Sequence, residues 1–292
     1  MKRRDFLKLA SGIIASMYST GKPAIGLLPS PQVVRVENGQ PVHMLKAALQ
    51  EFGGIKRFVA AGDMVLIKPD MAWDRMPELA ASTNSDLVVE IIMQCFQAGA
   101  KEVGVLDRHC NHALQRAAPN GIELRSEAAG AQVILVEPLE FPITFLPYGK
   151  KLKYWPISQE YLAADKVINV PFAKKHGLDG VSLGIRNLQA IIGRDKGKLY
   201  ADYPTHLIDI VSHILPTLSI IDATNTNHRS VNNPKRKSVS TLIVSPCAVS
   251  ADVSSLALFG YSLKDIPYLQ AAVDRGLSVF PLQDLHVKTI CF

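Results

Sequence analysis

Short apolar runs recur along the chain, and they constrain the fold more than any other feature of the sequence. The runs are four or five residues long, rich in valine and isoleucine, and separated by turn residues, which is typical of buried strands. Segments with helical spacing lie between them, and strands that alternate with helices pair in parallel. We therefore predict an α/β fold with a mostly parallel sheet and helices on both faces, and leave open a division into two lobes. The predicted strands are residues 33–36, 64–68, 102–106, 132–136, 167–170, 218–221 and 241–244.

The segments between these runs carry helix signals. Glycines at 53 and 54 end the first predicted helix, and Asn84 is placed to cap a later one. Asp252 is predicted at the start of a helix that runs to Phe259, where an acidic side chain favours the helix dipole. Residues 137–157 contain four prolines, which predicts irregular or antiparallel structure instead. The predicted helices are residues 41–52, 87–97, 121–130, 159–163, 206–215 and 252–259.

Charge is distributed unevenly along the chain. The formal net charge is +6, but residues 1–30 hold five basic side chains against one acidic one, which is +4 and leaves only +2 for the rest. No basic stripe with interleaved aromatic residues is present, which argues against a nucleic-acid partner. A hydrophobic content of 48% is ordinary for a globular chain. Beyond the N-terminal region, no apolar run is long enough for a membrane helix.

The first eight residues read MKRRDFLK, and this pattern resembles the twin-arginine export signal. The apolar region that follows, Leu9–Met17, is too short and too rich in serine and glycine to span a bilayer stably. The pattern predicts a signal region at residues 1–30, a domain at residues 31–292, the twin-arginine translocase as a partner and a periplasmic or exported location. A basic arm that contains paired arginines is the alternative, and an uncleaved anchor stays open.

The four cysteines do not form a disulfide scaffold or a C-x-x-C pair. Cys95 falls in an apolar helical pattern and is predicted to lie in the core. Cys110, Cys247 and Cys291 could pair in an oxidising periplasm, and the sequence does not choose among them.

Polar side chains follow the predicted strand at residues 167–170. Lys174 and His176 come directly after it, and Arg186 and Asn187 return after a turn that contains glycine. Because ligands of open α/β sheets bind outside the carboxyl ends of the strands, these cations suit a carboxylate or a phosphate. Neighbouring positive charge should also lower the pKa of His176. The alternative is a solvated basic loop over a buried strand.

Two motifs in this region carry a family resemblance. Val170–His176 reads VPFAKKH and Arg186–Gly193 reads RNLQAIIG, which resembles the "VPKxKTH" and "KNxxG" segments of the domain-of-unknown-function 362 family. Phe172 stands where "VPKxKTH" has its first lysine, and Arg186 stands where "KNxxG" has its lysine. Looser matches extend from about Met64 to Gly276. The resemblance implies a fold and a site more than a known reaction. Many relatives carry an iron–sulfur segment whose cysteines this chain lacks, so no iron–sulfur cluster is expected.

The same resemblance implies further site residues. Lys68 lies in a segment similar to the family's "VLIKPN", and Asp222 and Asp252 lie in segments similar to "PxLxIvD" and "pvavDavaa". Asp107 begins the run DRHCNH, where His109, Cys110 and His112 are also chemically suited to a metal, although the family match covers only Asp107. A metal ion is therefore an open possibility, with Asp107 and His206 as its predicted ligands.

Three functions compete on this evidence. The first is an enzyme that acts on a small anionic substrate, with His176 and Lys174 as catalytic residues. The second is a non-catalytic exported protein that binds an anion or a metal complex, and the third is an accessory subunit of a redox system. The predicted ligand-binding residues are Lys68, Arg186, Asn187, Asp222 and Asp252.

Overall fold

The computed structural model describes residues 31–71, 82–108, 121–177, 179–193, 195–224, 240–278 and 284–292. Residues 31–292 form one compact unit, as their internal contacts show. The predicted export signal and the candidate metal ligands His109, Cys110 and His112 lie outside the described residues.

One large sheet organises this unit. Its eight strands follow the order β12-β1-β11-β10-β7-β2-β3-β4. Strand β11 runs antiparallel to β1 and β10, and the other neighbouring pairs are parallel. The predicted α/β fold with a mostly parallel sheet is therefore confirmed, and each predicted strand is present. The strands are β1 (Val33–Glu37), β2 (Met64–Pro69), β3 (Glu102–Arg108), β4 (Gln132–Val136), β7 (Lys166–Val170), β10 (Leu218–Ala223), β11 (Thr241–Ser245) and β12 (Val287–Cys291).

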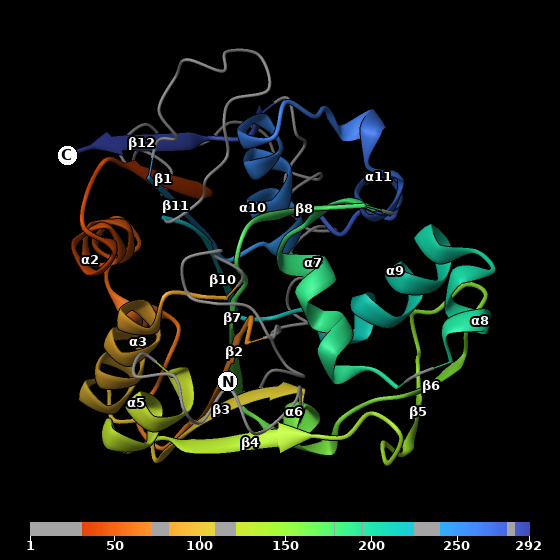
Figure 1. Ribbon diagram of the computed structural model, residues 1–292, viewed down its shortest axis with the longest axis horizontal. Helices are drawn as coiled ribbons and strands as arrows, with labels where there is room; N and C mark the ends of the chain where they lie inside the picture. The colour runs from red at the N-terminus through yellow and green to blue at the C-terminus, as the bar shows by residue number, and fades with distance from the viewer. Residues whose placement is uncertain are drawn as a thin grey trace, which may run out of the picture. The chain divides into compact units, whose positions relative to one another are not determined.

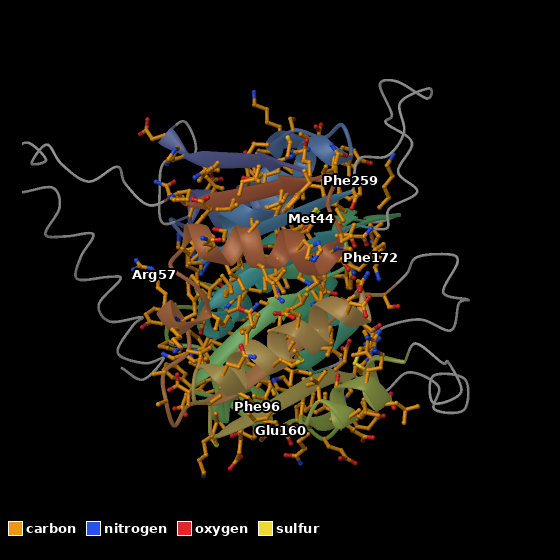
Figure 2. All side chains as sticks on the ribbon, turned by 90° about the vertical axis from the view of Figure 1, so that its left-hand side faces the viewer. Met44, Arg57, Phe96, Glu160, Phe172 and Phe259 are labelled. Atoms are coloured by element: carbon orange, nitrogen blue, oxygen red, sulfur yellow. The ribbon has the colours of Figure 1, made fainter. Side chains whose placement is uncertain are left out.

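Helices cover both faces of the sheet (Figure 1). On one face lie α2 (Pro41–Glu51), α3 (Ser85–Gln97) and α5 (Ile122–Ala128), seen in front of the strands in Figure 2. Met44 and Ile91 from these helices share a core with Ile67 of β2. Asn84 caps α3 by accepting a hydrogen bond from the backbone N–H of Asp86, as predicted.

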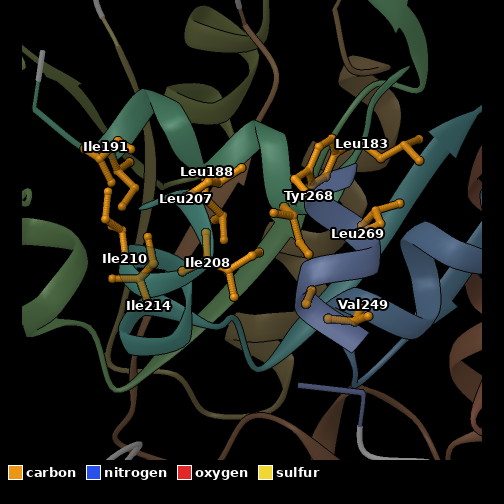
Figure 3. Close-up of a cluster of buried hydrophobic side chains, with 14 of the residues drawn as sticks. Leu183, Leu188, Ile191, Leu207, Ile208, Ile210, Ile214, Val249, Tyr268 and Leu269 are labelled. Atoms are coloured by element: carbon orange, nitrogen blue, oxygen red, sulfur yellow. The ribbon is translucent and has the colours of Figure 1, made fainter. Parts of the chain in front are cut away.

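The opposite face is covered by α7 (Gly184–Asn187), α9 (Tyr203–Ile214), α10 (Ala248–Ser255) and α11 (Pro267–Asp274). Their apolar side chains, among them Leu207 and Leu269, form a second core together with Leu188, which follows α7 (Figure 3). Leu66 belongs to this core, whereas its neighbour Ile67 belongs to the first, because successive strand residues point to opposite faces. Strands β10 and β11 are buried throughout, which explains why they read as continuous apolar runs.

Two short antiparallel pairs flank the large sheet. Strands β5 (Ile143–Phe145) and β6 (Tyr154–Pro156) confirm the antiparallel alternative for the proline-containing segment. Strands β8 (Lys174–His176) and β9 (Gly180–Ser182) form a hairpin where only a loop was expected. Gly180 has φ +75°, which glycine adopts without steric cost. The remaining short helices are α6 (Gln159–Ala163) and α8 (Lys196–Tyr200).

Two predicted helix starts are wrong. Helix α10 begins at Ala248, so Asp252 is its fifth residue and not its first. Helix α9 begins at Tyr203 with Pro204 in its first turn, a position where proline fixes the backbone angle that the helix needs. His206 therefore lies inside α9.

The thiols of Cys95, Cys247 and Cys291 are free, and the first two are buried. Within the described ranges, no helix combines the length and the apolar content needed to cross a membrane.

Candidate functional site

Strands β2, β3, β7 and β10 end at one edge of the sheet, and several predicted residues meet there. Lys68 of β2 stands opposite Asn169 of β7 in the parallel register. The ammonium nitrogen of Lys68 lies 2.8 Å from Asp107 Oδ1, and the ammonium nitrogen of Lys174 lies 2.7 Å from Asp70 Oδ2. Because Asp70 follows Lys68 by two residues and pairs with Lys174, Lys68 and Lys174 lie at the same edge, as predicted.

Lys68 is fully buried, so it is not a solvated lysine at a strand end. Besides Asp107, its ammonium group donates to the Pro69 carbonyl at 2.5 Å and lies 3.3 Å from Asn187 Oδ1. The Asp107 carboxylate also accepts hydrogen bonds from the backbone N–H groups of Met71 and Arg108, both at 2.7 Å. Such a pair is tolerated inside a protein because its remaining hydrogen-bonding groups are satisfied.

Asn187, Asn169 and Asp252 extend this buried network to helix α7. Asn187 Nδ2 donates to Asn169 Oδ1 at 2.8 Å, and Asn169 Nδ2 donates to the Gly184 carbonyl at 2.9 Å. The two oxygens of Asp252 accept the backbone N–H groups of Gly184 and Ile185 at 2.7 and 2.8 Å. A Cβ at position 184 would lie 2.7 Å from Asp252 Oδ1, so this approach requires glycine. The network fixes α7 to the sheet.

Asp252 thus caps a helix other than the one in which it lies. Its predicted position at the start of its own helix is wrong, and its carboxylate instead caps the N-terminus of α7. Burial raises the pKa of Asp252 to about 7, while the two backbone hydrogen bonds act in the opposite direction.

A second group lies closer to solvent, on the β8–β9 hairpin and α7. Arg186 Nη2 lies 2.8 Å from His176 Nε2, and Arg186 Nε donates to Asp179 Oδ2 at 2.6 Å. Asp179 Oδ2 also lies 3.3 Å from His176 Nδ1. Lys174 and His176 point to the same face of β8 because they are two residues apart. We call His176, Arg186, Asp179, Lys174 and Asp70 the edge cluster.

The contact with Arg186 determines the state of the His176 ring. A guanidinium can only donate hydrogen bonds, so Nε2 must accept, and the proton of the neutral imidazole sits on Nδ1, facing Asp179. The Asp179 backbone nitrogen also lies 3.3 Å from Nδ1. In this tautomer Nδ1 carries the proton, so it donates to the Asp179 carboxylate and does not accept from the backbone N–H. Burial and then the Arg186 charge lower the pKa of His176. The direction is as predicted, although burial is the larger cause.

Every cation of the site faces a carboxylate. Lys68 is paired with Asp107, Lys174 with Asp70 and Arg186 with Asp179. The sequence analysis placed cations at this edge but missed three of their neighbours, Asp70, Asp179 and Asn169. Asn169 carried a signal, because an amide inside an apolar strand must find hydrogen-bond partners.

Asp222 lies at the same edge, but it is buried and its oxygens are engaged. They accept hydrogen bonds from the Asn84 backbone at 2.7 Å and from the Thr224 backbone and hydroxyl at 3.0 and 2.7 Å. Burial raises the pKa of Asp222. These contacts join the end of β10 to the start of α3, and a ligand-binding role for Asp222 or Asp252 stays a prediction.

His206 lies apart from the edge cluster on the surface of α9, where Nδ1 contacts the Lys198 carbonyl at 2.8 Å. The residues that the structure describes contain no group of three or more His, Cys, Asp or Glu side chains suited to a metal ion. Metal binding by Asp107 and His206 stays a prediction without support from this geometry.

Aromatic side chains lie beside Arg186. Tyr200 and Tyr203 stack with ring centroids 4.7 Å apart, and Tyr203 meets Tyr268 edge to face at 6.2 Å. Burial raises the pKa of both Tyr203 and Tyr268, so their hydroxyl groups are neutral. Tyr200 and Tyr203 are close enough to Arg186 to influence its guanidinium electrostatically.

A pocket of about 310 Å³ lies at the opposite edge of the sheet, near the amino ends of β2, β3 and β4, with Met64, Glu102, Gln132 and Glu160 among its lining residues. None of the predicted site residues lines it. The chemistry of the edge cluster and this pocket are therefore separate features.

The chain is similar to a protein family and to known proteins. Residues 65–257 match the family described as Domain of unknown function (DUF362). A similar protein is the thylakoid-associated protein sll1697 of Synechocystis, 25% identical over 259 residues that cover 83% of this chain and 77% of the relative. Among solved structures, the lactate racemase apoprotein of Thermoanaerobacterium thermosaccharolyticum is similar, with a TM-score of 0.44 and 16% identity over 70% of this chain. The chain spans 54% of that protein's length.

Proposed function

This chain belongs to the family described as Domain of unknown function (DUF362), and we propose that it is an enzyme that acts on a small anionic molecule at the carboxyl edge of its sheet. The observation that carries the proposal is the 2.8 Å contact between Arg186 Nη2 and His176 Nε2. It joins an anion-binding group directly to a group that can transfer protons near neutral pH.

The contact makes ligand binding and proton transfer depend on each other. As long as Arg186 donates to Nε2, the lone pair that would accept a substrate proton is occupied. A carboxylate or phosphate that binds the guanidinium bidentately draws it away from the imidazole and exposes this lone pair. The negative charge of the ligand also raises the pKa of His176. Binding therefore makes His176 available as a base and increases its basicity.

Lys174 supplies a second cation on the same face of β8, and its side chain is 22% exposed. Its partner Asp70 is buried, and burial raises the pKa of Asp70. When a ligand anion pairs with Lys174, Asp70 loses its counter-ion. Asp70 can then take up a proton, and this proton offsets the negative charge that the ligand brings to the edge cluster. In this proposal Lys174 and Arg186 orient the substrate, and His176 moves the proton.

Anion binding is tested by titration with inorganic phosphate and with acetate, followed by the NMR signals of the His176 ring. In the wild-type protein we expect the pKa of His176 to rise when the anion binds. Arg186→Gln should weaken binding by about 1.5–3 kcal/mol, the usual value of a hydrogen bond to a charged group. Arg35→Gln is the matched control, because Arg35 pairs with Glu37 on β1, and strands β11 and β10 separate β1 from β7. Equal affinity in the two variants would count against the site.

Catalysis is tested separately from binding. A panel of small carboxylic and phosphorylated acids is incubated with the protein in deuterium oxide, and exchange of carbon-bound hydrogen is followed by NMR. We expect one class of acid to exchange, and His176→Gln to abolish the exchange while the anion still binds. Binding without exchange in the wild-type protein would favour the alternative, a non-catalytic ligand-binding protein. A metal or chromophore that co-purifies in stoichiometric amount would favour the accessory redox subunit.

We also propose export through the twin-arginine pathway, on the evidence of the MKRRDFLK segment. The translocase reads the paired arginines, so Arg3→Lys combined with Arg4→Lys should leave the protein in the cytoplasm. Cell fractionation measures this, and normal export of the double variant would refute it.

A further inference from the structure

The β5–β6 hairpin presents an exposed apolar face. Phe145 and Tyr154 stand directly opposite each other in the register, with ring centroids 5.4 Å apart. Ile143 lies two residues from Phe145 and therefore points to the same face. The exposed fractions of Ile143, Phe145 and Tyr154 are 67%, 54% and 58%, whereas Trp155 on the other face is 1% exposed. One face of the hairpin packs into the core, and the other presents large apolar side chains to solvent.

Large apolar side chains are also exposed in the segments beside the strands. Leu139 and Tyr148 are 79% and 53% exposed. Together with Ile143, Phe145 and Tyr154 they define a surface that we call the hairpin face. Single exposed apolar residues are common, but several large ones gathered at one hairpin mark an interaction surface.

Basic residues accompany the hairpin face. Residues 141–156 contain Lys150, Lys151 and Lys153 and no acidic residue, and Glu137 and Glu140 lie before this segment, around Leu139. All three lysines are exposed, and Lys151 reaches Asp202 at 2.5 Å. Lysines can bind a negatively charged surface, and the large apolar side chains beside them can insert into an apolar layer beneath that surface.

Hydrogen bonds to α9 fix the loop that joins β5 and β6. The buried Asp209 carboxylate accepts the backbone N–H groups of Lys150, Lys151 and Leu152, each at 2.7 Å, and pairs with Arg275 at 2.5 Å. These contacts fix the backbone that carries the three exposed lysines. Because the hairpin face is ordered in advance, docking requires little further loss of conformational entropy.

We propose that the hairpin face docks on an anionic membrane surface. Tyrosine and phenylalanine are suited to the boundary between headgroups and acyl chains, and each lysine near an anionic leaflet contributes to attraction. The strands are three residues long, so the hairpin reaches only this boundary. The inference is independent of the reaction at the edge cluster.

The test places a fluorescent probe on the hairpin face of the full chain. Tyr154→Trp is compared with Leu124→Trp, since Leu124 on α5 is 53% exposed and lies on a different surface. Vesicles of phosphatidylcholine and phosphatidylglycerol with brominated acyl chains quench tryptophans that reach the acyl boundary. We expect added quenching in Tyr154→Trp and none in Leu124→Trp. The N-terminal region is the same in both variants, so its own membrane affinity cannot produce this difference. Equal quenching in the two variants would overturn the proposal.

A second measurement tests the charge. Lys150→Gln with Lys153→Gln should reduce partitioning to the anionic vesicles on the order of tenfold, and added salt should remove most of the difference. Lys101→Gln is the control, because Lys101 is exposed on another surface. Partitioning that is unchanged in the double variant would refute the role of charge. A change of oligomeric mass in Phe145→Ser without vesicles would identify the hairpin face as an interface between copies and also overturn the proposal.

Discussion

The carboxyl edge of the sheet holds two groups of the same chemistry in different surroundings. In the buried network, Lys68 and Asp107 are 0% and 3% exposed, whereas Lys174 of the edge cluster is 22% exposed and His176 is 30% exposed. Both groups pair cations with carboxylates. The comparison indicates that access to solvent, and not the type of residue, separates the side chains that hold α7 in place from those that can meet a ligand.

The largest expected effect follows removal of a buried charge. Lys68→Met leaves Asp107 without its counter-ion in the interior and should lower the free energy of unfolding by about 3–5 kcal/mol. Denaturation by urea measures this. Combining it with Asp107→Asn should recover part of the loss, since the buried charge is then gone.

Lys288→Met is the matched control for this prediction. Lys288 pairs with Glu51 at 2.6 Å, but the two side chains are 46% and 27% exposed, so the loss should stay below about 1 kcal/mol. If both lysine variants lost the same stability, the contrast between buried and exposed pairs would fail.

The second prediction concerns the pH dependence that Asp252 contributes. Its pKa is raised from 3.8 to about 7 by burial, so the folded protein retains a proton that the unfolded chain has lost. The contribution of Asp252 to stability is therefore complete below pH 3.8 and declines as the pH rises toward 7. A shift of roughly 3 units corresponds to at most about 4 kcal/mol.

Asp252→Asn should flatten this part of the stability curve. The unfolding free energies of the variant and the wild-type protein are compared at each pH, so that titration of other groups cancels. Parallel curves between pH 4 and 7 would show that Asp252 keeps an ordinary pKa.

The smallest effect is expected in the edge cluster. His176→Gln should change the unfolding free energy at neutral pH by no more than about 0.5 kcal/mol, because the side chain is partly exposed and neutral. The lowered pKa of His176 means that protonation is disfavoured in the folded state. Below its ordinary value of 6.5 the wild-type protein should therefore lose stability relative to the variant. A loss as large as that of Lys68→Met would place His176 among the structural residues.

Much of the fold and the outline of the site could be predicted from the sequence. The strands are continuous apolar runs, and parallel pairing brings Lys68, Asp107 and Asp222 to one edge. The β8–β9 hairpin could not be predicted, because a strand that reads Lys-Lys-His has no apolar alternation. The carboxylate partner Asp179 depends on that hairpin. Asp252 reaches a helix N-terminus 67 residues away, and no local pattern encodes such a contact.

The position of β1 has a consequence for the order in which the sheet can be completed. In the finished sheet, Val34 stands opposite Val244 of β11 on one side and Lys288 of β12 on the other. A ribosome releases β1 long before it has made either partner. During synthesis the backbone N–H and C=O groups on both edges of this strand are unpaired until β11 and β12 have been made. Unpaired strand edges are prone to pair with other chains. Protection of the nascent chain over residues 33–37 is therefore a requirement that the topology itself imposes.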